Sequence, residues 1–455
     1  MNIINPATGE IIKTLSADSP TAIEQKYQKL KAGQKAWAAR PLAERVAIIA
    51  KFSELLEAEK AALAAILSSE VGKPLGQAAG EINGARGRIG FFVKNAEKWL
   101  ASETIHEEPN LKEMISFEPL GVIANISAWN YPYLVGVNVF IPALIAGNAV
   151  LYKPSEYASL TGLEIARLLY AAGVPEDVFA LVLGAATAGQ ALLELPLDGY
   201  YFTGSYATGR YIAEQVAKKL VPCQLELGGK DPLYVSAHND NIANVAVNAA
   251  EGAFYNNGQS CCAVERIYVH ASVYDEFISA FVAETKSYKV GSPTEEGVFI
   301  GPLTRAAQVA ILENQVQDAL DKGAKLELGG KAIEGAGYYF EPTVLSNVNH
   351  SMLLMTEESF GPIIGIQKVG EVNEAIALMR DTEYGLTSAI YSNNQEETKT
   401  FLAQMNSGTV YSNCCDRVSA NLPWTGRGNS GLGSTLSYMG IRAFVQPKAW
   451  HIRNV

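Results

Sequence analysis

Cysteine and histidine are scarce in this chain, whose 455 residues include only five of each. The cysteines are Cys223, Cys261, Cys262, Cys414 and Cys415, so four stand in adjacent pairs and the odd number leaves one unpaired in any disulfide scheme. Such usage is poor for a secreted disulfide scaffold and ordinary for a reducing compartment. The histidines are scattered, without the paired spacing of a metal site, so we expect no metal and a cytoplasmic protein.

Positive charge is also in deficit. Lys and Arg number 36 against 47 Asp and Glu, a formal net charge of −11. Nucleic acids and anionic membranes bind basic surfaces, so neither is an expected partner. The most apolar stretch, residues 120–151, is interrupted by Asn125, Asn130, Pro132 and Pro142, which argues against a membrane helix. The first residues lack the basic and apolar pattern of a signal peptide, so we expect a soluble chain.

Apolar residues, in contrast, make up 48% of the chain, and its length allows two lobes. In residues 1–100, apolar side chains such as Leu42, Ile49, Phe52 and Leu56 recur at helical spacing. After residue 117, short apolar runs alternate with amphipathic segments, which predicts an α/β protein with parallel sheets covered on both faces. The expected strands are 121–127, 149–153, 179–184, 199–204 and 224–227, and then 232–236, 266–270, 363–368, 387–392 and 408–412.

Two glycine motifs could bind a dinucleotide. Residues 426–431 match G-x-G-x-x-G, but Pro423 and Trp424 precede them where a strand is needed, so we reject this match. Residues 204–209 follow an expected strand and precede an expected helix over 211–220. Backbone N–H groups near Gly204 and Ser205 would then face a phosphate. Taken alone, this motif is more often an ordinary glycine turn.

Three polar residues could carry chemistry. Cys261 follows a segment rich in glycine and amides, as an approachable nucleophile requires, although adjacent cysteines are more often buried structure. Glu226 ends an apolar strand, where desolvation would raise its pKa towards that of a general base; the alternative is a solvated strand end. Asn130 could donate a hydrogen bond to an oxyanion or simply stabilise the turn before Pro132. A thiol protease is disfavoured, because no histidine stands in a recognisable cysteine-protease context.

In combination, these features resemble the aldehyde dehydrogenase superfamily over nearly the whole chain. The matching segments stand in the family's order and roughly at its spacing. They are NPATGE at 5–10, WN at 129–130, KPSE at 153–156, FTGS at 202–205, LELGGK at 225–230, GQSC at 258–261, ESFGP at 358–362, Asn413, and SGLG at 430–433.

The resemblance implies a role for each matching residue. Cys261 takes the position of the nucleophile, with Cys262 as a bystander, and Glu226 that of the base that activates water. Asn130 and the backbone N–H of Cys261 match the oxyanion hole. The residues that correspond to the cofactor site are Trp129, Lys153, Ser155, Glu156, Gly204, Ser205, Glu358 and Phe360.

The resemblance also implies a fold of three parts. A Rossmann-like nucleotide-binding domain would comprise residues 1–104 and 120–228, and an α/β catalytic domain residues 229–428. A small β oligomerisation element would combine residues 105–119 with 429–455. The assembly is expected to be a homodimer or a homotetramer.

The implied reaction is the oxidation of an aldehyde through a thioester on Cys261, with a nicotinamide cofactor. Some relatives transfer the acyl group to coenzyme A, but Glu226 favours hydrolysis by water. A carboxylate at Glu156 would accept hydrogen bonds from a ribose hydroxyl and repel a 2′-phosphate, which favours NAD. Lys153 and Ser155 could still hold that phosphate, so NADP stays open.

The opening segment, the short length and the sequence as a whole are most similar to the compact succinate-semialdehyde dehydrogenases. The arginines often used there for the substrate carboxylate are replaced by Asn138 and Tyr255. Arg417, with Ser419, is the best remaining anion partner, unless it faces solvent.

Alternatively, Tyr133, Tyr255 and Trp424 could line a pocket for a medium-chain aldehyde or for betaine aldehyde. A non-enzymatic protein of this fold would have no need to keep Cys261, Glu226 and Asn130 together. A disulfide between adjacent Cys261 and Cys262 would be strained and is not expected.

Overall fold

A six-stranded sheet forms the centre of the first lobe in the computed structural model, which describes residues 1–453. The strand order is β19-β9-β8-β5-β6-β7, and all pairs are parallel except β19 with β9. The strands are β5 (Val122–Ile126), β6 (Ala149–Lys153), β7 (Phe179–Leu181), β8 (Gly199–Thr203), β9 (Cys223–Glu226) and β19 (Gly431–Leu432). The first five were all expected from the sequence.

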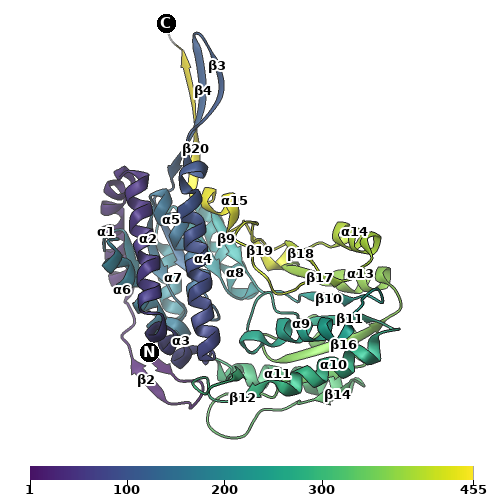
Figure 1. Cartoon of the computed structure of the whole chain (residues 1–455). Helices are drawn as coiled ribbons and strands as arrows, with labels where there is room; N and C mark the ends of the chain where they lie inside the picture. The colour runs from purple at the N-terminus through teal and green to yellow at the C-terminus, as the bar shows by residue number, and fades with distance from the viewer. Residues whose placement is uncertain (454–455) are drawn as a thin grey trace.

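Helices cover both faces of this sheet (Figure 1). Alternate strand residues separate the two faces: Ile123 and Val150 pack into one apolar core, whereas Val122 and Leu151 pack into another. On the first face lie α2 (Leu42–Ala58), α3 (Lys60–Val71), α4 (Leu75–Leu100), α5 (Pro132–Ala146) and α6 (Ser159–Ala172). On the second lie α1 (Pro20–Ala39), α7 (Ala186–Glu194) and α8 (Tyr206–Val216).

Glycine and proline residues set the ends of α3 and α5, two helices close to the candidate active site. Gly72 adopts a φ of 80° after α3, a left-handed cap that glycine reaches without a Cβ clash. Pro132 stands in the first turn of α5, where its missing N–H costs no intrahelical hydrogen bond, and Gly147 ends that helix with a φ of 99°. Because 13 of its residues are buried, α5 is a core helix rather than an amphipathic one.

The second lobe contains a seven-stranded sheet in the order β14-β15-β16-β11-β10-β17-β18. Its strands are β10 (Pro232–Val235), β11 (Arg266–His270), β14 (Lys325–Leu328), β15 (Thr343–Ser346), β16 (Ile363–Val369), β17 (Thr387–Tyr391) and β18 (Thr409–Ser412). Only β14 is antiparallel to its neighbour, and β14 and β15 were not expected from the sequence. One core contains side chains of α9 (Ile242–Phe254) and α10 (Tyr274–Ser287), and the other those of α11 (Ala306–Asp321), α13 (Val372–Arg380) and α14 (Gln395–Gln404).

Three antiparallel strands form an arm that projects beyond both lobes (Figure 1). They are β3 (Glu103–Glu108), β4 (Leu111–Pro119) and β20 (Val445–Arg453). Ile105, Trp450 and Ile452 are exposed on this arm, with 59%, 42% and 41% of their surface accessible. The shorter elements are β1 (Asn2–Ile4), β2 (Ile11–Thr14), β12 (Lys289–Val290), β13 (Val298–Ile300), α12 (Leu353–Thr356) and α15 (Ser437–Arg442).

The rejected glycine motif at 426–431 joins the two lobes. The N–H of Leu227 donates to the Ser430 carbonyl at 3.0 Å, and the N–H of Gly385 donates to Ser430 Oγ at 3.0 Å. A Cβ on Gly426 would lie 2.3 Å from the Ser430 backbone, so close packing explains this glycine. Within residues 1–453, no helix is long and apolar enough to cross a bilayer.

Candidate active site

A cavity of about 580 Å³ lies where the two lobes meet, and Cys261 lines it. Its walls come from α4 and α5 of the first lobe, from the end of β9, and from the segments before Cys261 and after β18. The charged and nucleophilic residues that line it are Arg88, Glu226, Glu251, Cys261, Cys262, Cys414, Cys415, Asp416 and Arg417.

A left-handed turn presents Cys261 to this cavity. Asn256, Asn257 and Gly258 have φ values of 53°, 59° and 67°. Asparagine tolerates this region, but position 258 requires glycine because a Cβ there would lie 2.3 Å from the Gly361 carbonyl oxygen. The Asn257 side chain donates to the Gly301 carbonyl at 3.0 Å and anchors the turn. The glycine- and amide-rich segment seen in the sequence is therefore the turn that shapes the nucleophile loop.

The two adjacent thiols have different environments. Cys261 is partly exposed, whereas Cys262 is buried and its thiol donates to Asp416 Oδ1 at 3.1 Å. The contact with Cys261, together with burial, holds the pKa of Cys262 well above its usual range. Cys262 therefore stays a thiol, and Cys261 is the one that an aldehyde can approach.

Asn130 lies beside the nucleophile loop, between β5 and α5. Its Nδ2 donates to the Gln259 carbonyl at 3.1 Å, and its own carbonyl accepts from Lys73 Nζ at 2.7 Å. Lys73 forms a buried ion pair with Glu81, whose other oxygen accepts from the Tyr133 N–H at 2.8 Å. Two residues of the α3–α4 region thus fix both Asn130 and the first turn of α5.

Glu226 ends β9 and lines the cavity. Its Oε1 accepts from Thr435 Oγ1 at 3.2 Å, while Oε2 is buried without a hydrogen-bond partner among the described residues. Desolvation raises the pKa of this carboxyl to about 8. A group of this kind is suited to taking a proton from water at a slightly alkaline pH.

Three of the residues that were predicted to hold the cofactor lie at the carboxyl edge of the six-stranded sheet, namely Lys153, Ser155 and Glu156. Lys153 ends β6, and its buried Nζ donates to the Pro154 carbonyl at 3.2 Å and lies 4.0 Å from Glu156 Oε2. The Glu156 side chain is 39% exposed, and Ser155 Oγ accepts from the Tyr157 N–H at 3.3 Å. One ammonium and one carboxylate therefore lie close together at the end of β6.

The expected phosphate cradle begins a helix, but earlier than predicted. Helix α8 starts at Tyr206 rather than at residue 211, with exposed Ser205 as its N-cap residue. A Cβ on Gly204 would lie 2.4 Å from the Phe202 ring, and one on Gly209 would lie 2.4 Å from Leu227. These glycines serve packing, while the first N–H groups of α8 remain at the sheet edge for an anion.

The second lobe supplies Glu358 and Phe360. Glu358 is half-buried, accepts from the Gly229 N–H at 3.2 Å, and has its pKa raised to about 8 by desolvation. The Phe360 and Trp129 rings are 5.5 Å apart across the two lobes. Glu265 holds this loop by accepting from the Phe360 N–H at 2.9 Å. The exposed start of α8, the Lys153 ammonium and the carboxyl groups of Glu156 and Glu358 are donors and acceptors of the kinds that a nicotinamide dinucleotide needs.

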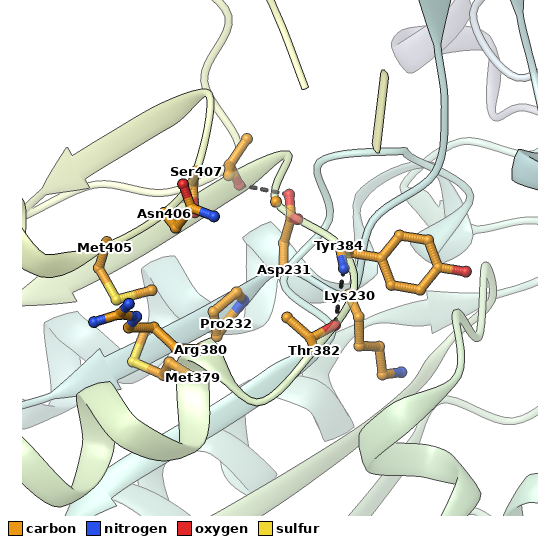
Figure 2. A pocket seen from close by; sticks show the side chains of 12 residues that line it. Lys230, Asp231, Pro232, Met379, Arg380, Thr382, Tyr384, Met405, Asn406 and Ser407 are labelled. Atoms are coloured by element: carbon orange, nitrogen blue, oxygen red, sulfur yellow. Dashed lines mark hydrogen bonds between the residues drawn. The ribbon is translucent and has the colours of Figure 1, made fainter. Parts of the chain in front are cut away.

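A second hollow, of about 110 Å³, surrounds Lys230 and Asp231 (Figure 2). Figure 2 shows these two side chains pointing away from one another. Asp231 accepts from Thr387 Oγ1 at 2.5 Å, and Lys230 Nζ donates to Glu265 at 2.6 Å. These groups are engaged in holding β10 and the 358–360 loop, and no cysteine lines the hollow, so the larger cavity is the better candidate.

The predicted substrate residues divide into two groups. Tyr255, Arg417 and Trp424 line the cavity. Tyr133 is fully buried in the apolar core, and Ser419 is exposed and accepts from the Asn421 N–H at 3.3 Å; neither lines the cavity.

Arg88 was missed by the sequence analysis, because it stands in a long helical segment where a charge normally marks a solvated face. Glu81 lies two turns earlier on the same helix, and the pairing of α4 with α5 turns both residues inward. No local signal in the sequence identifies that inward face.

The comparisons with known proteins agree with this geometry. The model of the aldehyde dehydrogenase family matches residues 1–450, and the chain belongs to this family. It is 34% identical over 450 residues to a succinate-semialdehyde dehydrogenase, NADP(+), of Deinococcus radiodurans, covering 98% of this chain and 93% of that protein.

Solved structures agree over the same length. An Escherichia coli NADP-dependent enzyme superposes with a TM-score of 0.97 at 31% identity, covering 100% of this chain and 94% of that one. A 3,6-anhydro-L-galactose dehydrogenase in complex with NAP superposes with a TM-score of 0.95 at 32% identity, covering 100% and 96%. The α/β fold class expected from the sequence is thereby confirmed, and the chain is an aldehyde dehydrogenase.

Proposed function

We propose that this enzyme oxidises succinate semialdehyde, or a closely similar aldehyde with a carboxylate tail, to the corresponding acid. The proposal rests on the composition of the cavity. Cys261 and Glu226 line it together with two arginines, Arg88 and Arg417. A carboxylate entering a protein with a net charge of −11 needs a local cation, and this cavity provides it. The similarity to succinate-semialdehyde dehydrogenases supports the same substrate class.

The chemistry assigned to the chain's own residues has two stages. The Cys261 thiolate adds to the aldehyde carbon, and the Asn130 amide and the Cys261 N–H stabilise the oxygen anion that forms. A bound nicotinamide supplies a hydride acceptor. The acyl group then remains on Cys261 as a thioester, and Glu226 takes a proton from the water that hydrolyses it. Release of the acid restores the thiol, so no coenzyme A is needed.

We propose that both nicotinamide cofactors bind and that Glu156 sets the preference towards NAD. Lys153 and Ser155 would hold a 2′-phosphate, as the NADP(+) in the relatives' names suggests. At about 5 Å in water-like surroundings, one negative charge repels another by about 0.8 kcal/mol. Glu156→Gln should therefore raise kcat/KM for NADP about fourfold, with kcat/KM for NAD changing less. An unchanged ratio of the two values would show that Glu156 does not govern the choice.

The substrate is tested by the rate of reduced-nicotinamide formation. Succinate semialdehyde should be oxidised with a higher kcat/KM than its methyl ester, hexanal or betaine aldehyde. Cys261→Ala should abolish turnover of all four, since the nucleophile is common to them. If hexanal or betaine aldehyde is preferred, the proposed substrate is wrong while the family assignment stands. If Cys261→Ala stays active, the proposed nucleophile is wrong.

We further propose that the chain self-associates through the arm formed by β3, β4 and β20, in a reducing compartment such as the cytoplasm. The arm projects from the lobes and exposes Ile105, Trp450 and Ile452, which would be unusual for a surface that always faces water. Light scattering should give the mass of a dimer or tetramer. A monomer at micromolar concentration would contradict this proposal.

A further inference from the structure

Arg88 places a guanidinium in the wall of the catalytic cavity. It lies on α4, and the cavity is lined there by Gly84, Gly87 and Arg88. A Cβ on Gly87 would meet no atom within 4 Å, so there is open space beside this part of the helix. Desolvation lowers the pKa of Arg88 to about 10, so the group is still a full cation at neutral pH. Arg88 lines the same cavity as Cys261, Cys262 and Glu226, so it can contact a ligand that is bound beside them.

Helix α5 fixes Arg88 in this position. Nη1 donates to Asn138 Oδ1 at 3.0 Å and to the Leu134 carbonyl at 3.1 Å. Among the described residues, Nε and Nη2 have no protein hydrogen-bond partner and are not enclosed as buried unpaired atoms. A guanidinium held by one nitrogen and free at the other two can bind a carboxylate by two parallel hydrogen bonds.

The acidic groups around Arg88 do not neutralise it. Glu81 is already paired with Lys73 inside the protein. Glu226 is largely protonated at neutral pH, because burial raises its pKa to about 8. The positive charge of Arg88 is therefore available to a ligand in the cavity.

Arg417, the other arginine of the cavity, has a different environment. It is exposed to solvent, and the buried carboxyl of Asp416 stands next to it in the chain. Glu251 lines the same part of the cavity and also acts on Asp416. An exposed arginine beside two acidic groups gives a bound carboxylate little net attraction.

We propose that Arg88 binds the carboxylate tail of the substrate, and that Asn138 is a positioning residue that orients the guanidinium. This inference rests on the proposed function, because it assumes a substrate with a carboxylate. Position 138 thus contributes indirectly: its amide holds an arginine that arrives from α4. The aldehyde end of the substrate then reaches Cys261 in the same cavity.

The test compares Arg88→Met with the matched variant Arg417→Met, using succinate semialdehyde and its methyl ester. Loss of a charge-assisted hydrogen-bonded pair should lower kcat/KM for succinate semialdehyde by about 10- to 100-fold in Arg88→Met. Turnover of the uncharged ester should stay within about threefold of the wild-type value, since none of its groups pairs with Arg88. Arg417→Met removes the more exposed arginine of the same cavity, so it should lower the ratio of kcat/KM for the acid to kcat/KM for the ester less than Arg88→Met does. The inference is overturned if Arg417→Met no longer prefers succinate semialdehyde to its methyl ester while Arg88→Met keeps this preference.

Two further variants keep the test decisive if Arg88→Met folds poorly. Arg88→Lys keeps the positive charge but loses the pair of parallel N–H donors of the guanidinium. It should raise KM for succinate semialdehyde with a smaller effect on kcat. Asn138→Leu should also raise this KM, and should raise the KM of the ester less, because the hydrogen bond that orients Arg88 is lost. Equal effects on acid and ester in both variants would contradict the assignment. A wild-type enzyme that does not distinguish the acid from its ester would instead refute the proposed function.

Discussion

Glu226 should make the rate of thioester hydrolysis depend on pH in a predictable direction. Its pKa is raised to about 8 by burial, and a general base acts only when it is deprotonated. About one molecule in eleven has the ionised carboxylate at pH 7, and about ten in eleven have it at pH 9. The steady-state rate should therefore rise about tenfold over this range where hydrolysis is rate-limiting. Below pH 7 it should fall about tenfold for each unit of pH.

Replacing the base separates the two stages of the reaction. Glu226→Gln keeps the size and the Thr435 hydrogen bond but cannot take a proton, so hydrolysis should slow by about 100-fold or more. A rapid burst of one reduced nicotinamide per active site should remain, because Cys261 still forms the thioester. Stopped-flow absorbance measures the burst, and the later slope measures hydrolysis.

Thr435→Val is the control for Glu226→Gln. It retains the Glu226 carboxyl and removes the hydrogen bond that Thr435 donates to it. That bond lowers the pKa of Glu226, so its loss should shift the rise in rate to higher pH. Hydrolysis in Glu226→Gln that keeps the wild-type rate and pH profile would refute the assignment of Glu226 as the base.

The other predictions concern stability. Lys73→Met leaves the Glu81 carboxylate buried without its ion partner and should destabilise the fold by about 3–5 kcal/mol, whereas Lys60→Met breaks a part-exposed pair with Glu57 and should cost less than about 1 kcal/mol. Urea denaturation measures both, and equal losses would contradict the role given to burial. Gly258→Ala, at a φ of 67° and beside the Gly361 carbonyl, should cost about 2 kcal/mol or more; Gly90→Ala, with open space around it in α4, should be neutral or stabilising by up to about 1 kcal/mol. The two changes in melting temperature should have opposite signs or differ clearly, and similar values would show that the backbone of the nucleophile turn is not constrained.

The sequence by itself determined the α/β fold class, because alternation of short apolar runs and amphipathic segments is a local property. It also singled out Cys261, Glu226 and Asn130, since each stands at the end of a strand or in a glycine-rich turn that local patterns reveal. The strand β14 escaped prediction because it is an edge strand with exposed residues and lacks the apolar run of a buried strand. The strand β15 is buried, but its four residues include Thr343 and Ser346, so its apolar run is too short to stand out.

Only the tertiary structure decided what surrounds the nucleophile. Tyr133 was expected in the substrate pocket, but the structure buries it in the apolar core. Other residues of α5, among them Leu134 and Asn138, line the cavity. Arg88 was not singled out in the sequence, and it is the packing of α4 against α5 that places it in the cavity wall. Helical periodicity fixes which residues share a face, whereas the direction of that face depends on contacts between segments that are about 50 residues apart, as Arg88 and Asn138 are.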